Sequence, residues 1–235
     1  MKQFIFLLGV IFVSLYSNAQ TELWGMTLYG GQYDGGTIFK TDNLGSDESV
    51  EYNFFLNEGY GSDKAKLTQA LDGNFYGLTT SNSSYGILFQ YNPVTNIYTR
   101  KINFNTIISG QYPCGSLLQA SDGKLYGMTS MGGLSNCGIL FQYDPISNIL
   151  TKKVDFASCG LNKPSGSLMQ ASDGRLYGMT NLGGVNNLGA LFQYDPVTNV
   201  CIKKIDFDGL TNGSKPNGNL IQATNGKLYG LTPSG

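Results

Sequence analysis

Short apolar runs, separated by two kinds of tight turn, recur along most of the chain. Between Gly115 and Phe156 these runs cover residues 117–121, 124–129, 138–143 and 149–156. Asp122-Gly123 joins the first two runs, and this dipeptide favours a two-residue type I′ turn because both turn positions need positive φ. Residues 144–148, with the sequence Asp-Pro-Ile-Ser-Asn, join the last two runs. They favour a turn, because proline presets φ and the polar residues bond the local backbone. The pattern predicts four short strands.

The predicted strands are apolar on both faces. In the run 138–143, Ile139, Phe141 and Tyr143 point one way and Leu140 the other. A sheet with one solvated face would alternate more cleanly between apolar and polar residues. Burial on both faces is typical of a propeller blade, which lies between two neighbouring sheets.

The same unit returns about every 50 residues. An aromatic-Gly-x-Thr element marks the step, beginning at Trp24, Tyr76, Tyr126, Tyr177 and Tyr229. Units of that length are the size of kelch-like blades. We therefore expect an all-β fold, a β-propeller built of four-stranded blades of about 50 residues. A parallel β-solenoid is the alternative, but its rungs are usually shorter and lack repeated two-residue hairpins.

The N-terminus has the pattern of an export signal. Residues 1–19 combine Lys2, an apolar run over 4–16, and small residues at Ser17 and Ala19 before a cleavage site. A signal-anchor helix competes with this interpretation, but the run is shorter than the ~20 residues that span a bilayer. We expect an exported bacterial protein, extracellular or at the cell surface, with no transmembrane segment after signal cleavage.

The repeats are expected to fill residues 20–235. Their predicted units are about 20–56, 57–105, 106–157, 158–208 and a partial 209–235. The first unit starts at its second strand and the last stops after its second strand. A closed ring of four blades would use residues 219–223 to complete the first sheet and would leave 227–232 over. We therefore expect a fragment of a longer array with more blades.

Composition argues against nucleic-acid binding and against histidine-based catalysis or metal binding. A net charge of −1 gives no electrostatic footprint for nucleic acid, and the chain has no histidine, the commonest general base and metal ligand. No cofactor is implied. Basic pairs recur on the fourth strand, at residues 100–101, 152–153 and 203–204. One interpretation is that these pairs form a basic stripe that binds acidic polymers. Lysine on an exposed edge strand, however, more often blocks aggregation between edges.

The four cysteines are Cys114, Cys137, Cys159 and Cys201, which an exported protein can pair in three ways. They occupy non-equivalent repeat positions, and without a CxxC element a structural zinc site is disfavoured. If a disulfide forms, the sequence favours Cys137 with Cys159, because these residues flank the open end of one predicted hairpin.

Most repeated polar residues have a structural explanation. The turn aspartates Asp72, Asp122 and Asp173 lack the spacing of a calcium loop. Asp155 and Asp206 could form an acid pair for glycoside cleavage, but repeated polar residues are more often hydrogen-bonding groups at strand ends. The threonine that ends each aromatic-Gly-x-Thr element is expected to make a buried hydrogen bond to the backbone.

The long loops are the predicted binding region, because binding concentrates on loops that a rigid scaffold positions. They connect the second strand to the third, and one unit to the next, and they open on one end of the propeller. Candidate ligand-face residues are Asn82, Tyr85, Asn136, Asn186 and Asn187, whose amides and ring would suit sugar hydroxyls. Simple loop formation is the competing explanation of these asparagines. No residue is predicted to be catalytic.

The motifs LYGMTSMGG…GILFQYDP and LYGMTNLGG…GALFQYDP, with the degenerate WGMTLYGG…GGTIFKTD, resemble the GloVer-type tandem repeat of secreted bacterial proteins. The likeness covers nearly all of the chain after the signal. It implies an extracellular or cell-surface location and a propeller-like fold, without an established activity or catalytic residues. Residues 81–85 depart from the family pattern, because they replace its Gly-Gly loop.

Two functions are therefore weighed. The first is a non-catalytic binding module, with an extracellular glycan or protein as partner. The alternative is a secreted propeller enzyme acting on glycans, as a hydrolase or lyase. Near-identity of the units favours the first, because a catalytic site must break the symmetry of its blades. A stalk or spacer without any ligand is a third possibility.

Overall fold

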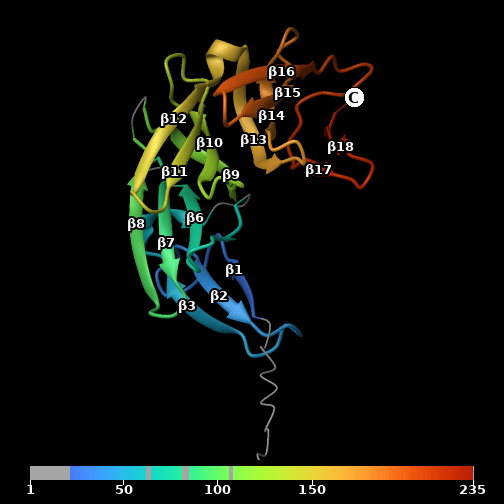
Figure 1. Cartoon of the computed structure of the whole chain (residues 1–235). Coiled ribbons are helices and arrows are strands. Elements are labelled where there is room, and N and C mark those ends of the chain that lie inside the picture. Colours follow the sequence, from blue (N-terminus) through green and yellow to red (C-terminus); the bar gives the residue numbers. More distant parts are fainter. Residues whose placement is uncertain (1–21, 62–64, 81–84, 106–107, 235) are drawn as a thin grey trace, which may run out of the picture.

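The computed structural model describes residues 22–61, 65–80, 85–105 and 108–234. These residues form β-strands and two short 3-10 helices, η1 (Leu56–Glu58) and η2 (Phe156–Cys159). The strands form antiparallel sheets that follow one another along an arc (Figure 1). The predicted β-propeller fold is confirmed, and the solenoid alternative is not. The predicted signal at residues 1–19 lies outside the described residues.

Each sheet is one blade, whose strands follow the chain from the inner edge to the outer edge. The first blade contains β1 (Leu23–Met26), β2 (Thr37–Thr41) and β3 (Ser49–Asn53). The second contains β4 (Tyr60–Gly61), β5 (Thr68–Gln69), β6 (Phe75–Thr80), β7 (Ile87–Asn92) and β8 (Ile97–Asn103). The third contains β9 (Gln111–Gln119), β10 (Leu125–Met131), β11 (Ile139–Asp144) and β12 (Ile149–Asp155). The fourth contains β13 (Leu161–Gln170), β14 (Leu176–Gly183), β15 (Ala190–Asp195) and β16 (Val200–Asp206), and a last hairpin contains β17 (Ile221–Gln222) and β18 (Leu228–Tyr229).

The innermost strand of the third blade is longer than predicted. β9 begins at Gln111, whereas the sequence predicted a strand over 117–121, and its pairing with β10 shifts register between Tyr126 and Met128. Gly115 lies in this strand with φ 69°, and a Cβ there would lie 2.0 Å from the carbonyl oxygen of Gly166 in β13. The segment extends the strand because it packs backbone to backbone against the next blade, a contact that local sequence does not reveal.

The aromatic-Gly-x-Thr element and the Phe of the third strand pack against each other within each blade. In the third blade Gly127 pairs with Phe141, and a Cβ at Gly127 would lie 2.4 Å from Phe141 Cζ. The ring therefore lies over the glycine, which leaves room for it by having no side chain. Phe141 is fully buried as a result.

Neighbouring blades are joined by rows of phenylalanines. The residue that follows the fourth strand of one blade packs on the third strand of the next: Phe54 contacts Phe89 at a centroid distance of 5.3 Å, and Phe156 contacts Phe192 at 5.2 Å. All four rings are fully buried. This explains why the strands are apolar on both faces, as expected of sheets sandwiched between neighbours.

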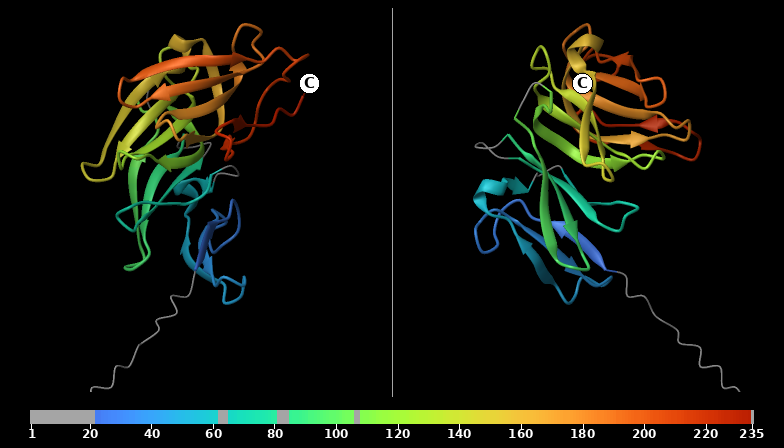
Figure 2. Two further views of the ribbon diagram at one scale, coloured as in Figure 1. Left: turned by 45° about the vertical axis from the view of Figure 1, so that its right-hand side comes forward. Right: turned by 60° about the vertical axis from the view of Figure 1, so that its left-hand side comes forward.

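The arc stays open within the described residues. β17 pairs with β18, and neither strand joins the first sheet, so residues 219–223 do not complete that sheet. Figures 1 and 2 show the last hairpin and the first blade at opposite ends of the arc. Among the described residues, none belongs to a helix long and apolar enough to cross a membrane.

Candidate functional site

The propeller has two chemically different ends. Leu125 at the start of β10 pairs with Tyr143 near the end of β11, so the Asp-Gly turn and the Asp-Pro turn of a blade lie at the same end. We call this the turn end. The longer connections between strands and between blades lie at the opposite, loop end, where the sequence predicted ligand binding.

Two of the predicted loop residues are used by the loops themselves. The side-chain oxygen of Asn136 accepts a hydrogen bond from the Gly132 amide at 2.8 Å, and that of Asn187 accepts one from Gly183 at 2.9 Å. Both asparagines have φ 54°, which an asparagine tolerates better than most residues. They hold the loop conformation, as the competing explanation proposed.

Tyr85 and Asn186, two of the other predicted loop residues, are exposed, as Asn136 and Asn187 are. Tyr85 is 39% exposed, and its ring meets that of Tyr112 edge-on at 5.5 Å. Asn186 is exposed at the tip of the loop between β14 and β15. Asn82 lies outside the described residues. A ligand role for this end of the propeller stays a prediction.

Asp155 and Asp206 are hydrogen-bonding groups at strand ends, as expected. Asp155 accepts the Leu134 amide at 3.1 Å and pairs with Lys152 Nζ at 2.7 Å. Asp206 accepts the Val185 amide at 2.9 Å and pairs with Lys203 Nζ at 2.8 Å. The hydrogen bond from Lys203 lowers the pKa of Asp206. A carboxyl held ionised in this way is a poor general acid.

The basic pairs lie on the outermost strands, as predicted, because β8, β12 and β16 form the free edge of their sheets. The first residue of each pair, Arg100, Lys152 or Lys203, makes an ion pair at the edge of its blade. Lys152 and Lys203 pair with aspartates of their own blades, whereas Arg100 pairs with Glu58 of η1, in the connection that precedes its blade.

Two of the five repeated threonines donate the expected hydrogen bonds to backbone carbonyls. Thr79 Oγ1 donates to the carbonyl of Glu58 at 2.7 Å, and Thr129 Oγ1 donates to that of Met131 at 2.8 Å. Thr180 is equally buried, but its hydroxyl has no hydrogen-bond partner within the described residues.

The cysteines are free thiols in the structure and make different contacts. Cys114 Sγ lies 3.4 Å from the carbonyl oxygen of Pro164, and Cys137 Sγ lies 3.4 Å from that of Ser135. Cys159 Sγ lies instead within 4.0 Å of the carbonyl oxygen of Cys201. The structure thus brings Cys159 together with Cys201, and the predicted pairing of Cys137 with Cys159 stays a prediction.

A groove on the turn end was not predicted from the sequence. It has a volume of about 420 Å³ and lies between the third and fourth blades. The third blade contributes its first turn, and the fourth contributes the end of β13 and both of its turns. The lining residues are Ser121, Asp122, Gln170, Asp173, Gly174, Arg175, Asp195, Pro196, Val197 and Thr198.

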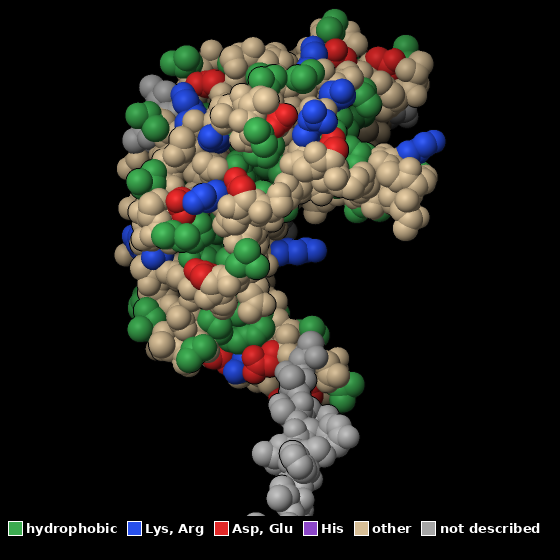
Figure 3. Space-filling model, in the orientation of Figure 1, with side chains coloured by type: hydrophobic (Ala, Val, Ile, Leu, Met, Phe, Trp, Pro, Cys, Tyr) green, Lys and Arg blue, Asp and Glu red, His purple; other side chains and the backbone are tan. Residues whose placement is uncertain are grey.

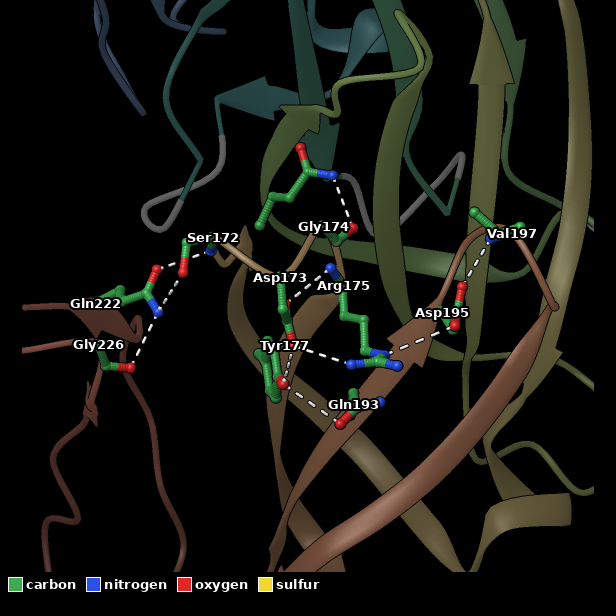
Figure 4. Close-up of polar contacts among 11 residues, drawn as sticks. Ser172, Asp173, Gly174, Arg175, Tyr177, Gln193, Asp195, Val197, Gln222 and Gly226 are labelled. Atoms are coloured by element: carbon green, nitrogen blue, oxygen red, sulfur yellow. Dashed lines mark hydrogen bonds and ion pairs between the residues drawn. The ribbon is translucent and has the colours of Figure 1, made fainter.

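Arg175 lies at the centre of the fourth-blade side of this groove (Figure 4). Its Nη1 is 3.3 Å from Asp173 Oδ2 and its Nε is 3.6 Å from Asp195 Oδ2. Asp173 also accepts the hydroxyl of Tyr177 at 2.9 Å, and that hydroxyl is 3.3 Å from Gln193 Oε1. The guanidinium therefore bridges the two turns of the blade.

The groove is acidic. It contains three carboxylates, from Asp122, Asp173 and Asp195, and one guanidinium. Hydrogen bonds from the Val197 and Thr198 amides lower the pKa of Asp195. Burial opposes ionisation of Asp173, but hydrogen bonds from the Arg175 amide and the Tyr177 hydroxyl outweigh it and lower the pKa of this carboxyl. Both carboxylates are charged at neutral pH.

An equivalent groove lies between the second and third blades, lined by Leu71, Asp72, Gln119, Gly123, Pro145 and Ile146. Its volume is about 310 Å³. Lys124, which pairs with Asp144 at 2.6 Å, stands in the register position of Arg175. Only one aspartate, Asp72, lines this groove, so the groove next to Arg175 is the more strongly charged of the two.

Exposed aliphatic side chains flank the grooves. The second turn of each blade carries one such residue at the same repeat position, with exposed fractions of 82% for Leu44, 90% for Val94, 89% for Ile146 and 87% for Val197. Figure 3 shows hydrophobic side chains in small separate groups over one face of the arc, among acidic and basic ones. The grooves thus combine apolar and charged contacts.

Gln119 and Gln170, from the innermost strands of the third and fourth blades, fix the walls of these grooves. Gln170 Oε1 accepts the Ser121 amide of the preceding blade at 2.9 Å, and its Nε2 donates to the Gly174 carbonyl at 2.8 Å. Gln222 makes the same bonds to Ser172 and Gly226 (Figure 4). The groove is therefore preformed by hydrogen bonds between blades.

Comparison with known proteins assigns the chain to a family. A family model described as the Gloeobacter/Verrucomicrobia repeat matches residues 13–235. The chain belongs to the Gloeobacter/Verrucomicrobia repeat family. The resemblance seen in the sequence is thus confirmed. No curated protein matches this repeat protein.

Solved propeller structures resemble the chain in fold at low sequence identity. TolB from Acinetobacter baumannii has 14% identity and a TM-score of 0.58, over 90% of this chain and 47% of TolB. The extracellular domain of the one-component system BT4673 from B. thetaiotaomicron has 15% identity and a TM-score of 0.61, over 91% of this chain and 25% of that one. A chain of the nidogen/laminin complex has 12% identity and a TM-score of 0.61, over 91% of this chain and 71% of that one. The repeat protein thus spans less than half the length of the first two.

The described residues contain no cluster of three or more cysteine, aspartate or glutamate side chains that could hold a metal ion. The site that the structure offers is a preformed, acidic and partly apolar groove. One signal in the sequence could have pointed to it. Arg175 stands where the other repeats have Glu22, Asn74, Lys124 and Lys227, so the charge at this position differs between units.

Proposed function

We propose that this repeat protein is an exported, non-catalytic binding module that holds a segment of another protein in the groove between its third and fourth blades. The observation that carries this proposal is the composition of the groove. Val197, 87% exposed, stands beside the carboxylates of Asp122, Asp173 and Asp195. Burying an exposed valine against a partner would contribute about 1.5–3 kcal/mol.

Charge complementarity defines the partner. Three carboxylates against one guanidinium favour a segment that carries lysine or arginine next to an aliphatic residue. None of the residues that line the described groove is aromatic, so it lacks the ring face that a sugar would stack on. A protein partner therefore fits this groove better than a glycan.

Export rests on the sequence of the first nineteen residues, which have the organisation of a cleaved signal. We infer that the binding partner is met outside the cytoplasm. N-terminal sequencing of the natural protein recovered from the periplasm or the medium should start at Gln20. Retention of Met1 on protein in the cytoplasm would contradict export without bearing on the groove.

The binding proposal is tested with a random-peptide library displayed on phage and panned on residues 20–235. Selected peptides should share a basic residue next to an aliphatic one, and their affinity should fall as salt rises. Val197→Ser removes the apolar contact without adding charge and should weaken a selected peptide about tenfold, which corresponds to roughly 1.4 kcal/mol. Val94→Ser is the matched control, because Val94 is equally exposed but belongs to another blade.

Peptides without basic residues, or equal effects of the two variants, would contradict the proposed groove. A glycan substrate is tested in parallel. Release of reducing ends from a polysaccharide, abolished by a single Asp→Asn change, would favour the enzymatic alternative instead.

A further inference from the structure

We propose that Cys159 and Cys201 form a disulfide that joins the connection between the third and fourth blades to the outer strand of the fourth blade. Cys159 ends η2, and Cys201 is the second residue of β16. This inference goes beyond the binding function, because it concerns neither the groove nor its partner.

The two thiols lie in one place. Cys159 Sγ is 4.0 Å from the carbonyl oxygen of Cys201. Both thiols are partly buried and, like Cys114 and Cys137, pack against the apolar cluster that includes Phe156 and Tyr194. Cys114 and Cys137 contact other backbone carbonyls, those of Pro164 and Ser135.

The repeat explains how the pair arises. Cys201 pairs with Tyr194 in the register in which Leu150 pairs with Tyr143 and Tyr98 pairs with Tyr91. The other blades thus fill this position with a large side chain, and Tyr98 packs there against Phe54 at a centroid distance of 5.8 Å. The smaller Cys201 leaves space beside Phe156, and the sulfur of Cys159 lies next to it.

The geometry also favours the reaction. The neighbouring Cys201 thiol lowers the pKa of Cys159, and the same contact raises the pKa of Cys201. Cys159 is therefore the more readily ionised of the two thiols, and the thiolate is the attacking form in disulfide exchange. Cys201 is the resolving thiol.

The oxidant is a low-molecular-weight disulfide such as oxidised glutathione. The Cys159 thiolate attacks one of its sulfurs, which breaks that S–S bond, forms a mixed disulfide and releases one glutathione thiolate. Cys201 then loses its proton and attacks the Cys159 sulfur, which releases the second glutathione thiolate and forms the protein disulfide. The two protein thiols lose two electrons and two protons, and the oxidant takes the electrons as its S–S bond is reduced.

The test is a disulfide map of the folded protein, residues 20–235, after equilibration with oxidised glutathione and blocking of remaining thiols. Trypsin places the four cysteines in four different peptides, 102–124, 125–152, 154–175 and 176–203. The expected result is a reducible link between 154–175 and 176–203. A link between 125–152 and 154–175, or no link in protein with a native circular dichroism spectrum, would overturn the proposal.

A thermal measurement gives an independent readout. Closing the chain between residues that are 42 positions apart should raise the melting temperature of the oxidised protein by roughly 10 °C over the reduced protein. Cys201→Ser should abolish this difference, and Cys137→Ser, the matched control, should keep it. An oxidation-dependent shift that survives in Cys201→Ser but not in Cys137→Ser would assign the disulfide to another pair.

Discussion

At the scale of single residues, the repeat motif describes one contact made in every complete blade. The glycine of each aromatic-Gly-x-Thr element faces the phenylalanine of the next strand, as Gly127 faces Phe141 and Gly178 faces Phe192. Because the ring occupies the space that a side chain would need, the two residue types must occur together. The motif therefore records packing within the blade rather than a binding site.

Gly127→Ala should destabilise the protein by about 1–3 kcal/mol, the usual cost of overpacking a core. The new Cβ would lie 2.4 Å from Phe141 Cζ, so the buried ring must move. In a chain of this size the melting temperature should fall by roughly 5 °C, measured by circular dichroism. Gly218→Ala is the control, because nothing lies within 4 Å of a Cβ at that position. Equal melting temperatures of the two variants would contradict this packing.

At the scale of elements, the blades are joined by repeated contacts of two kinds. Phenylalanines such as Phe156 bury apolar area between neighbouring sheets. Glutamines such as Gln119 and Gln170 add hydrogen bonds that run from the innermost strand of one blade to the first turn of the preceding blade. Each blade is thus aligned by its neighbour, and the grooves at the turn end follow from this alignment.

Removing one of these glutamines should loosen a single junction. In Gln170→Ala the Ser121 amide loses its acceptor, so its hydrogen exchange should accelerate about tenfold, which corresponds to one hydrogen bond of roughly 1.4 kcal/mol. The measurement is amide exchange by NMR. Gln69→Ala is the control, because Gln69 has the same strand position but makes no bond to another blade within the described residues. Unchanged exchange at Ser121 would show that the bond does not hold the junction.

At the scale of the whole molecule, fully buried tyrosines lie in the successive interblade cores. Tyr76, Tyr126, Tyr143 and Tyr194 have no exposed surface. Burial raises the pKa of Tyr143 to about 12 and raises the pKa values of the other three as well. The fold therefore depends on keeping these phenols neutral.

Stability should be lost in alkali. A raised pKa means that the folded state holds its protons more tightly than the unfolded state, whose tyrosines ionise near pH 10. Their contribution is complete below pH 10 and is lost as the pH rises from about 10 towards 12. The melting temperature should stay level between pH 7 and 9 and fall above pH 10, together with cooperative appearance of tyrosinate absorbance at 295 nm. Ordinary titration of all tyrosines near pH 10 with an unchanged far-ultraviolet circular dichroism spectrum would contradict this dependence.

The local pattern was enough to predict the blade. The Asp-Gly and Asp-Pro turns, the roughly 50-residue period and the two-sided apolar strands together indicate a four-stranded propeller unit, because each depends on residues close in the chain. The roles of the turn aspartates followed for the same reason. Asp122 Oδ1 accepts the Lys124 amide at 3.0 Å, a bond across two residues. The predicted loop residues Asn136 and Asn187 also hold their own loops.

The groove and the thiol pair were decided by the tertiary structure alone. Asp122 and Arg175 line one groove because neighbouring blades lie side by side, and Cys159 lies next to Cys201 because η2 packs on β16. The packing of Phe156 on Phe192 and the close approach of Gly115 to Gly166 hold the third and fourth blades together. These contacts join residues from different units, so the periodicity within a unit, which determined the fold, could not determine which side chains meet across its boundary.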